Sequence, residues 1–257
     1  MSLIRQEAWF EGAVQVLALN APPGNILDTS MITALQNHLK NIGESRDTKC
    51  IVLTGEGKHF SFGASVEEHR KEQAGAMLDA FHALFETLMD LSVPTVAMIT
   101  GRSPGGGFEL ALMCDFMFAD SSCLCGQPEI NLGVFAPPAS LILPLKIGQA
   151  QAEKILLTGE NVSAERLMEL GLLTEWFPDQ ASMVAGVREW THRSLLSKSG
   201  SSLRFAVRAA RWNFHRELRQ GLPELRSLYV EQLMETRDAN EGIQSFLEKR
   251  KPNWSNQ

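Results

Sequence analysis

The chain has 257 residues, of which 44% are hydrophobic and 21% are charged, and its formal net charge is −6. These values are typical of a globular protein with one sizeable core, or a core with a small appended domain. The negative charge argues against nucleic-acid binding, the apolar runs are too short to cross a bilayer, and the N-terminus lacks the apolar region of a signal peptide. We therefore expect a cytoplasmic protein that contacts neither a membrane nor nucleic acid.

Strands and helices alternate through the first part of the chain. Residues 13–19 (AVQVLAL) and 50–54 are typical of buried strands, and the spacing of hydrophobic residues between them predicts a helix. A long amphipathic helix is expected over about 75–91, followed by a strand over 93–100. The alternation continues to about residue 177, which predicts an α/β class of fold.

The rest of the chain has only helical patterns. Helices are expected near 180–197, 201–213, 216–236 and 239–250. The stretch 197–202 is rich in Ser and Gly, which is typical of a junction. We therefore predict an α/β core over residues 1–197 and a C-terminal helical region over residues 198–257.

A glycine triplet, residues 105–107, follows a predicted strand and opens a short apolar helix. Glycines let the backbone approach a ligand closely, and the first N–H groups of a helix have no partner within it. The positive end of the helix dipole also attracts negative charge. The triplet indicates either an anion-binding turn or only a tight connection between a strand and a helix.

The same region formally matches the Gly-x-Ser-x-Gly motif of serine hydrolases, with Ser103 as the nucleophile. In that motif, the backbone N–H of the residue after the serine stabilises the oxyanion. Here that residue is Pro104, which has no N–H. A serine hydrolase is therefore disfavoured.

Two glutamates lie beside glycine-rich turns. Glu109 falls in the first turn of the apolar helix, where the helix dipole favours a carboxylate, and Glu129 lies between Gly126 and Gly133. Separately, each has an ordinary interpretation, as a helix-capping residue and as an exposed loop residue. Together they are a candidate pair for general acid and base catalysis on one water.

The cysteines and histidines do not indicate a metal site. Four cysteines in a chain of this length do not suggest a disulfide framework. Cys123 and Cys125 lack further ligands at a compatible spacing, so no metal is expected. We interpret His59 and His69, which flank the turn at 62–65, as structural residues.

Three segments taken together resemble the crotonase, or enoyl-CoA hydratase/isomerase, superfamily. They are HFSFGAS (59–65), GRSPGGGFELAL (101–112) and GQPEINLG (126–133), and their order and spacing match along nearly the whole chain. The end of the chain, EGIQSFLEKR (241–250), is similar to the family's C-terminal signature. The resemblance implies a crotonase-like spiral of ββα units with a C-terminal helical region.

The resemblance also implies roles for individual residues. The N–H groups of Ala64 and Gly106 would form the oxyanion hole that binds the thioester carbonyl of an acyl-CoA. Glu109 and Glu129 would be the catalytic residues that hold the added water between them. Coenzyme A would then be part of the substrate, and neither a cofactor nor a metal is expected.

Two residues of the C-terminal signature match positions that contact the coenzyme A nucleotide in the family. They are Phe246 and Lys249, and in the family the contact often comes from a neighbouring subunit. The resemblance therefore implies a homotrimer or a homohexamer as the assembled form.

Other positions differ from ordinary fatty-acyl hydratases and bear on the substrate. Phe62 replaces a small residue, Ser65 replaces an acidic one, and VFAPPAS (134–140), which includes Phe135, replaces a glycine-rich stretch. Within the family, the resemblance is greatest to hydratases of a cyclic dienoyl-CoA in anaerobic degradation of aromatic acids, so Phe62 and Phe135 would contact the acyl group. The alternatives are a hydratase or isomerase of open-chain enoyl-CoA, and a non-catalytic acyl-CoA-binding protein.

Overall fold

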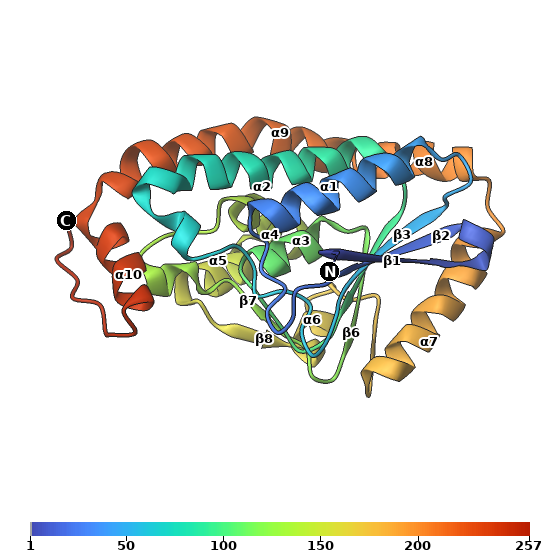
Figure 1. The fold of residues 1–257 in the computed structure, drawn as a ribbon, viewed down its shortest axis with the longest axis horizontal. Coiled ribbons are helices and arrows are strands. Elements are labelled where there is room, and N and C mark those ends of the chain that lie inside the picture. Colours follow the sequence, from blue (N-terminus) through green and yellow to red (C-terminus); the bar gives the residue numbers. More distant parts are fainter. Residues whose placement is uncertain (1) are drawn as a thin grey trace.

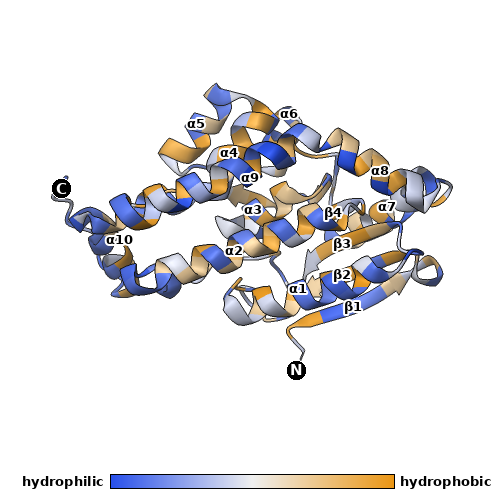
Figure 2. Ribbon diagram, turned by 90° about the horizontal axis from the view of Figure 1, so that it is seen from above, coloured by the Kyte–Doolittle hydropathy of each residue, from blue (hydrophilic) through white to orange (hydrophobic). Residues whose placement is uncertain are grey.

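The computed structural model describes residues 2–257, and its centre is a six-stranded sheet (Figure 1). In spatial order the strands are β1 (Ile4–Trp9), β2 (Val14–Leu19), β3 (Cys50–Gly55), β4 (Thr95–Ile99), β6 (Phe116–Asp120) and β9 (Glu175–Phe177). β1 and β2 pair antiparallel, and every other pair of neighbours is parallel. Parallel strands are covered on both faces, which is why β3 is almost entirely hydrophobic, as Figure 2 shows.

The strands that the sequence pattern did not predict are short or lie at an edge. β1 has four exposed residues in a row, so its sequence shows no alternation of buried and exposed positions. A second sheet consists of β5 (Arg102–Pro104), β7 (Leu124–Gly126) and β8 (Asn161–Ser163), in the order β5-β7-β8. Three residues are too few to establish a period of two.

Helices cover the sheet and carry the chain between parallel strands. They are α1 (Thr29–Glu44), α2 (Lys71–Leu91), α3 (Gly106–Met113), α4 (Pro137–Ile147), α5 (Gln149–Thr158), α6 (Ala164–Glu169) and α7 (Gln180–Thr191). α1 begins where the Asp28 carboxylate accepts a hydrogen bond from the Met31 N–H at 2.8 Å. α3 is the innermost helix, since all eight of its residues are buried.

The C-terminal part is helical, as predicted. It consists of α8 (Gly200–Ala210), α9 (Trp212–Ser227) and α10 (Arg237–Leu247). The helix expected over 216–236 is regular only to Ser227 and continues as irregular helical turns over Leu228–Gln232 and Leu233–Glu235.

These helices return over the core. α9 packs against α2 and α4, and α10 packs against the 3-10 helix Pro128–Leu132, at the end of the molecule where Figure 1 marks the C-terminus. Within residues 2–257, no helix has the length and the hydrophobicity that a membrane span requires. The division of the chain at residue 197 stays a prediction.

Candidate active site

A cavity of about 780 Å³ lies between the α/β core and the C-terminal helices. It contains seven of the eight residues that the sequence selected: Phe62, Ala64, Gly106, Glu109, Glu129, Phe135 and Phe246. They come from positions 62 to 246 of the chain, so the fold brings the separate segments to one place. The eighth residue, Lys249, is not part of the cavity wall.

Two glycines let the first two segments meet backbone to backbone. Gly63 has a φ of +83°, which L-residues rarely adopt, and a side chain there would begin 2.7 Å from the Gly106 nitrogen. A side chain on Gly106 would begin 3.0 Å from the Ala64 nitrogen. The N–H groups of Ala64 and Gly106 are therefore close neighbours, as expected for a pair of oxyanion donors.

The orientation of both N–H groups is fixed by a hydrogen bond to the carbonyl of the same peptide unit. The carbonyl before Ala64 accepts a hydrogen bond from the Leu27 N–H at 2.9 Å, and the carbonyl before Gly106 accepts one from the Glu109 N–H at 2.9 Å. In a planar trans peptide, the C=O and N–H point in opposite directions, so these bonds direct the two N–H groups away from their acceptors. Within residues 2–257, neither N–H has a hydrogen-bond acceptor. Two such donors can stabilise a negatively charged oxygen.

The loop before Ala64 is held by Asn25, a residue that the sequence did not single out. Its side-chain amide donates to three backbone carbonyls within residues 56–60, at 2.9 to 3.2 Å. The backbone carbonyl of Asn25 accepts a hydrogen bond from Ser61 Oγ at 2.7 Å, and Ser61 Oγ in turn accepts one from the Gly63 N–H at 3.0 Å. Asn25 therefore holds the loop before Ala64 from another part of the chain, and no local pattern around it predicts this.

Glu109 is buried on α3, with 4% of its surface exposed. One carboxyl oxygen accepts a hydrogen bond from the Ala139 N–H at 2.8 Å. Ala139 is the third residue of α4, and the two residues before it, Pro137 and Pro138, have no N–H. Burial and the nearby charge of Glu129 raise the pKa of Glu109 well above its ordinary value, and the Ala139 N–H offsets only part of this rise.

Glu129 lies on the 3-10 helix Pro128–Leu132, and its carboxyl packs against bare backbone. Gly105 has a φ of +55°, and a side chain there would begin 2.5 Å from Glu129 Oε1. The buried Gln127 amide, with its nitrogen turned towards the carboxylate, donates to its two oxygens at 3.2 and 3.1 Å. Burial of the carboxyl raises the pKa of Glu129 to about 7.

Two carboxyl groups with raised pKa values therefore face one cavity beside two free N–H donors. Because each negative charge disfavours the other, such a pair tends to keep one proton between them near neutral pH. One carboxyl can then accept a proton while the other donates one. This arrangement suits the addition of water next to a polarised carbonyl.

Aromatic side chains form another part of the wall. Phe135 packs edge-on against Tyr229, with the ring centroids 5.3 Å apart. Phe62 and Phe246 are exposed at the cavity and lie on the loop before Ala64 and on α10. Tyr229 is fully buried and comes from the irregular turns after α9. Nothing in the sequence marks it except that the chain has a single tyrosine.

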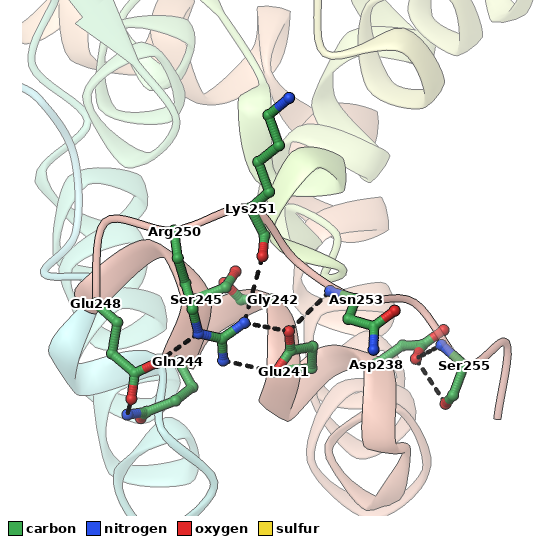
Figure 3. A network of polar contacts seen from close by, with 10 residues as sticks. All are labelled: Asp238, Glu241, Gly242, Gln244, Ser245, Glu248, Arg250, Lys251, Asn253 and Ser255. Carbon is green, nitrogen blue, oxygen red and sulfur yellow. Dashed lines mark hydrogen bonds and ion pairs between the residues drawn. The ribbon is translucent and has the colours of Figure 1, made fainter.

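The residues of the C-terminal signature hold α10 in place (Figure 3). Arg250 makes two hydrogen bonds to the Glu241 carboxylate, at 2.5 and 2.8 Å, and the Asn253 N–H donates to the same carboxylate at 2.8 Å. A side chain on Gly242 would begin 2.0 Å from the carbonyl oxygen of Leu132, the last residue of the 3-10 helix that carries Glu129. The signature thus packs α10 against the segment of a candidate catalytic residue.

Three other residues singled out in the sequence, Ser103, Cys123 and Cys125, are not part of the cavity wall. Ser103 is fully buried on β5. Cys123 and Cys125 are buried, with their sulfur atoms 3.6 Å apart. Among residues 2–257, no group of three or more His, Cys, Asp or Glu side chains is arranged to hold a metal ion.

Known proteins resemble this chain in sequence and in fold. The model of the enoyl-CoA hydratase/isomerase family matches residues 10–257. A cyclohexa-1,5-dienecarbonyl-CoA hydratase of Thauera aromatica is 40% identical over 252 residues, which are 97% of this chain and 96% of the relative. A 2,3-dehydroadipyl-CoA hydratase of Escherichia coli (strain K12) is 30% identical over 244 residues, or 94% of each chain.

The likeness extends to solved structures. The crystal structure of an enoyl-CoA hydratase from Mycobacterium avium matches with a TM-score of 0.86 and 26% sequence identity, covering 99% of this chain and 100% of the other. The elements therefore follow the same path in both proteins. This confirms the predicted crotonase-like α/β fold.

Proposed function

The chain belongs to the enoyl-CoA hydratase/isomerase family, and from this premise we propose that it adds water to cyclohexa-1,5-diene-1-carbonyl-CoA to give 6-hydroxycyclohex-1-ene-1-carbonyl-CoA. The observation that carries the reaction type is the pair of carboxyl groups, Glu109 and Glu129, beside the free N–H groups of Ala64 and Gly106 in one cavity. The cyclic acyl group is supported by the greater identity to the relative of that name, 40% against 30% for the dehydroadipyl-CoA hydratase. The reaction would belong to anaerobic degradation of aromatic acids.

In the proposed mechanism, the thioester carbonyl accepts hydrogen bonds from Ala64 and Gly106, which stabilise the negative charge that develops on its oxygen. The ionised carboxylate of the pair takes a proton from a water while the water oxygen forms a bond with a ring carbon. The protonated carboxyl of the pair delivers its proton to another ring carbon, where the displaced π electrons form the new C–H bond. The pair of Glu109 and Glu129 keeps its total charge, and coenzyme A serves only as part of the substrate.

The rest of the cavity is consistent with a flat, cyclic acyl group. The rings of Phe135 and Tyr229, with Pro137 and Pro138, form a stiff apolar wall near the two glutamates. Phe246 is exposed and could contact coenzyme A. A contact of Lys249 with the nucleotide, and a homotrimeric or homohexameric assembly, complete the proposal.

The test is a set of acyl-CoA thioesters compared by steady-state kinetics. We expect kcat/KM for the cyclic dienoyl-CoA to exceed that for crotonyl-CoA by at least about 10-fold, because enzymes discriminate between substrates through the shape of the acyl pocket. Mass spectrometry should show the gain of one water, and NMR should place the hydroxyl group on the ring. A higher kcat/KM with crotonyl-CoA would overturn the cyclic assignment.

The second candidate is a hydratase of open-chain enoyl-CoA. It is favoured by the E. coli relative, which covers nearly the whole chain at 30% identity. The same kinetic comparison separates the two candidates. Binding of the thioesters without any turnover would point instead to a non-catalytic acyl-CoA-binding protein.

A further inference from the structure

Tyr229 has a buried hydroxyl group that forms no hydrogen bond with the residues that the structure describes. It is the single tyrosine of the chain, and only 1% of its surface is exposed. Burying a hydroxyl without a partner is unfavourable, and a phenylalanine would fill the same space without this penalty. We therefore expect a molecule bound in the cavity to supply the hydrogen-bond partner of this hydroxyl.

The surroundings of Tyr229 limit what that partner can be. The residue lines the same cavity as Glu109 and Glu129. Burial, and the negative charge of whichever glutamate is ionised, raise the pKa of the phenol, so it keeps its proton at neutral pH and acts as a hydrogen-bond donor. Tyr229 is thus part of the wall of the cavity that both carboxyl groups face, which is where the added water is expected. Edge-on packing against Phe135 fixes the ring.

We propose that Tyr229 is a third catalytic residue, whose O–H donates a hydrogen bond to the oxygen atom that is added to the substrate. The water oxygen has two lone pairs: one forms the bond to carbon, and the other can accept from Tyr229. The same hydrogen bond would hold the hydroxyl group of the product and stabilise this oxygen as it departs in the reverse reaction. The inference rests on the proposed hydratase function, and it is independent of whether the acyl group is cyclic.

Tyr229→Phe is the direct test, because it removes one oxygen atom and keeps the ring against Phe135. We expect kcat to fall about 10-fold, which is the loss of one hydrogen bond, while KM stays within about 2-fold. A structural role for the ring alone would leave kcat unchanged. An unchanged kcat in a variant with wild-type thermal stability would overturn the proposal.

A pair of ligands that differ only in the hydroxyl group gives a second test. To prevent turnover of the ligand, we would titrate 6-hydroxycyclohex-1-ene-1-carbonyl-CoA and cyclohex-1-ene-1-carbonyl-CoA by calorimetry into Glu109→Gln, with and without Tyr229→Phe. The double variant should bind the hydroxylated ligand about 5–10-fold more weakly and the other ligand equally well. Equal changes for the two ligands, or none, would overturn the proposal.

An open-chain pair, 3-hydroxybutyryl-CoA and butyryl-CoA, separates this inference from the choice of substrate. If only the open-chain pair binds and Tyr229→Phe weakens only its hydroxylated member, the role of Tyr229 stands and the cyclic substrate is wrong. If the wild-type protein binds neither pair, both proposals are wrong.

The single tyrosine also gives a spectroscopic test. Protein labelled with ¹³C at the tyrosine ζ carbon has one such signal, and it reports on the Tyr229 hydroxyl alone. This signal should shift on addition of 6-hydroxycyclohex-1-ene-1-carbonyl-CoA by clearly more than on addition of the matched ligand without the hydroxyl. Equal shifts would contradict the hydrogen bond.

Discussion

Glu109 and Glu129 reach the same cavity from two different kinds of local structure. Glu109 lies on α3, whose eight residues are all buried, and a backbone N–H holds its carboxyl. Glu129 lies on a 3-10 helix without a fully buried residue, and its carboxyl is positioned by the bare backbone of Gly105 and by the side chain of Gln127. One carboxyl is therefore fixed by the core, and the other depends on two neighbours that single substitutions can change.

The largest expected effect tests whether both regions contribute to catalysis. Glu109→Gln and Glu129→Gln should each lower kcat by at least about 10²-fold, because each variant removes a group that transfers a proton in the proposed mechanism. The affinity for the thioester, measured by calorimetry, should change little. Glu189→Gln, an exposed position on α7, is the matched control and should behave as the wild type. Near-normal turnover in either active-site variant would remove that glutamate from the pair.

A substitution at Gly105 should disturb only the less protected carboxyl. In Gly105→Ala, the new carbon atom would begin 2.5 Å from Glu129 Oε1, at a φ of +55°. We expect kcat to fall about 10–10²-fold, because the carboxyl must move, and the free energy of unfolding to fall by about 1–3 kcal/mol.

The control for Gly105→Ala is Gly148→Ala. Gly148 has a φ of +76°, and a side chain there would meet nothing within 4 Å. The control should therefore lose stability with a normal kcat. An equal loss of turnover in the two variants would show that backbone strain, and not contact with Glu129, explains the effect.

Glu129 should also make stability depend on pH. Its pKa of about 7 in the folded protein lies above the ordinary value of 4.5, so the folded state keeps a proton that the unfolded state has lost. The contribution of Glu129 to stability is therefore most favourable below about pH 4.5, falls as the pH rises towards 7, and then levels off. Glu129→Gln should be more stable than the wild type by up to about 3 kcal/mol at pH 8, and by little at pH 4.5. Urea unfolding at the two pH values measures this, and equal differences at both would refute it.

The smallest effect concerns the amide next to Glu129. Gln127→Met removes the amide donor at nearly constant volume, so the ionised form of Glu129 loses support and its pKa should rise by about 0.5–1 unit. The limb of the kcat/KM profile where activity falls with decreasing pH, expected near pH 7, should move to higher pH by the same amount. A profile identical to that of the wild type would show that the Gln127 amide does not act on this carboxyl.

The sequence predicted the glycine turns of the site and the glutamates beside them, because the backbone geometry of these turns favours glycine. Gly63 and Gly105 have positive φ values, which favour glycine. A side chain would meet the Gly106 backbone at Gly63 and the Glu129 carboxyl at Gly105. The fold class followed from the alternation of strands and helices, whereas β1 and the three-residue strands had too few buried positions to form a pattern.

The missed residues act through contacts that are distant in the chain. Ala139 acts through its N–H, 30 positions from Glu109, and any residue except proline has that group. Asn25 supports a loop 35 positions away. Tyr229 reaches the cavity only because α9 folds back across α2 and α4. These contacts depend on the tertiary arrangement, and nothing in the neighbouring sequence marks them.

The proline pair at the start of α4 also limits how acidic Glu109 can become. Two or three backbone N–H bonds to a carboxylate can lower its pKa far below the ordinary value, which would keep it ionised at neutral pH. Because Pro137 and Pro138 have no N–H, Ala139 is the first residue of α4 that can donate one to Glu109. The N-terminus of α4 therefore positions the Glu109 carboxyl with one hydrogen bond, and the pKa of the carboxyl stays raised. In the proposed mechanism, the same side chain can then act as an acid in hydration and as a base in the reverse reaction.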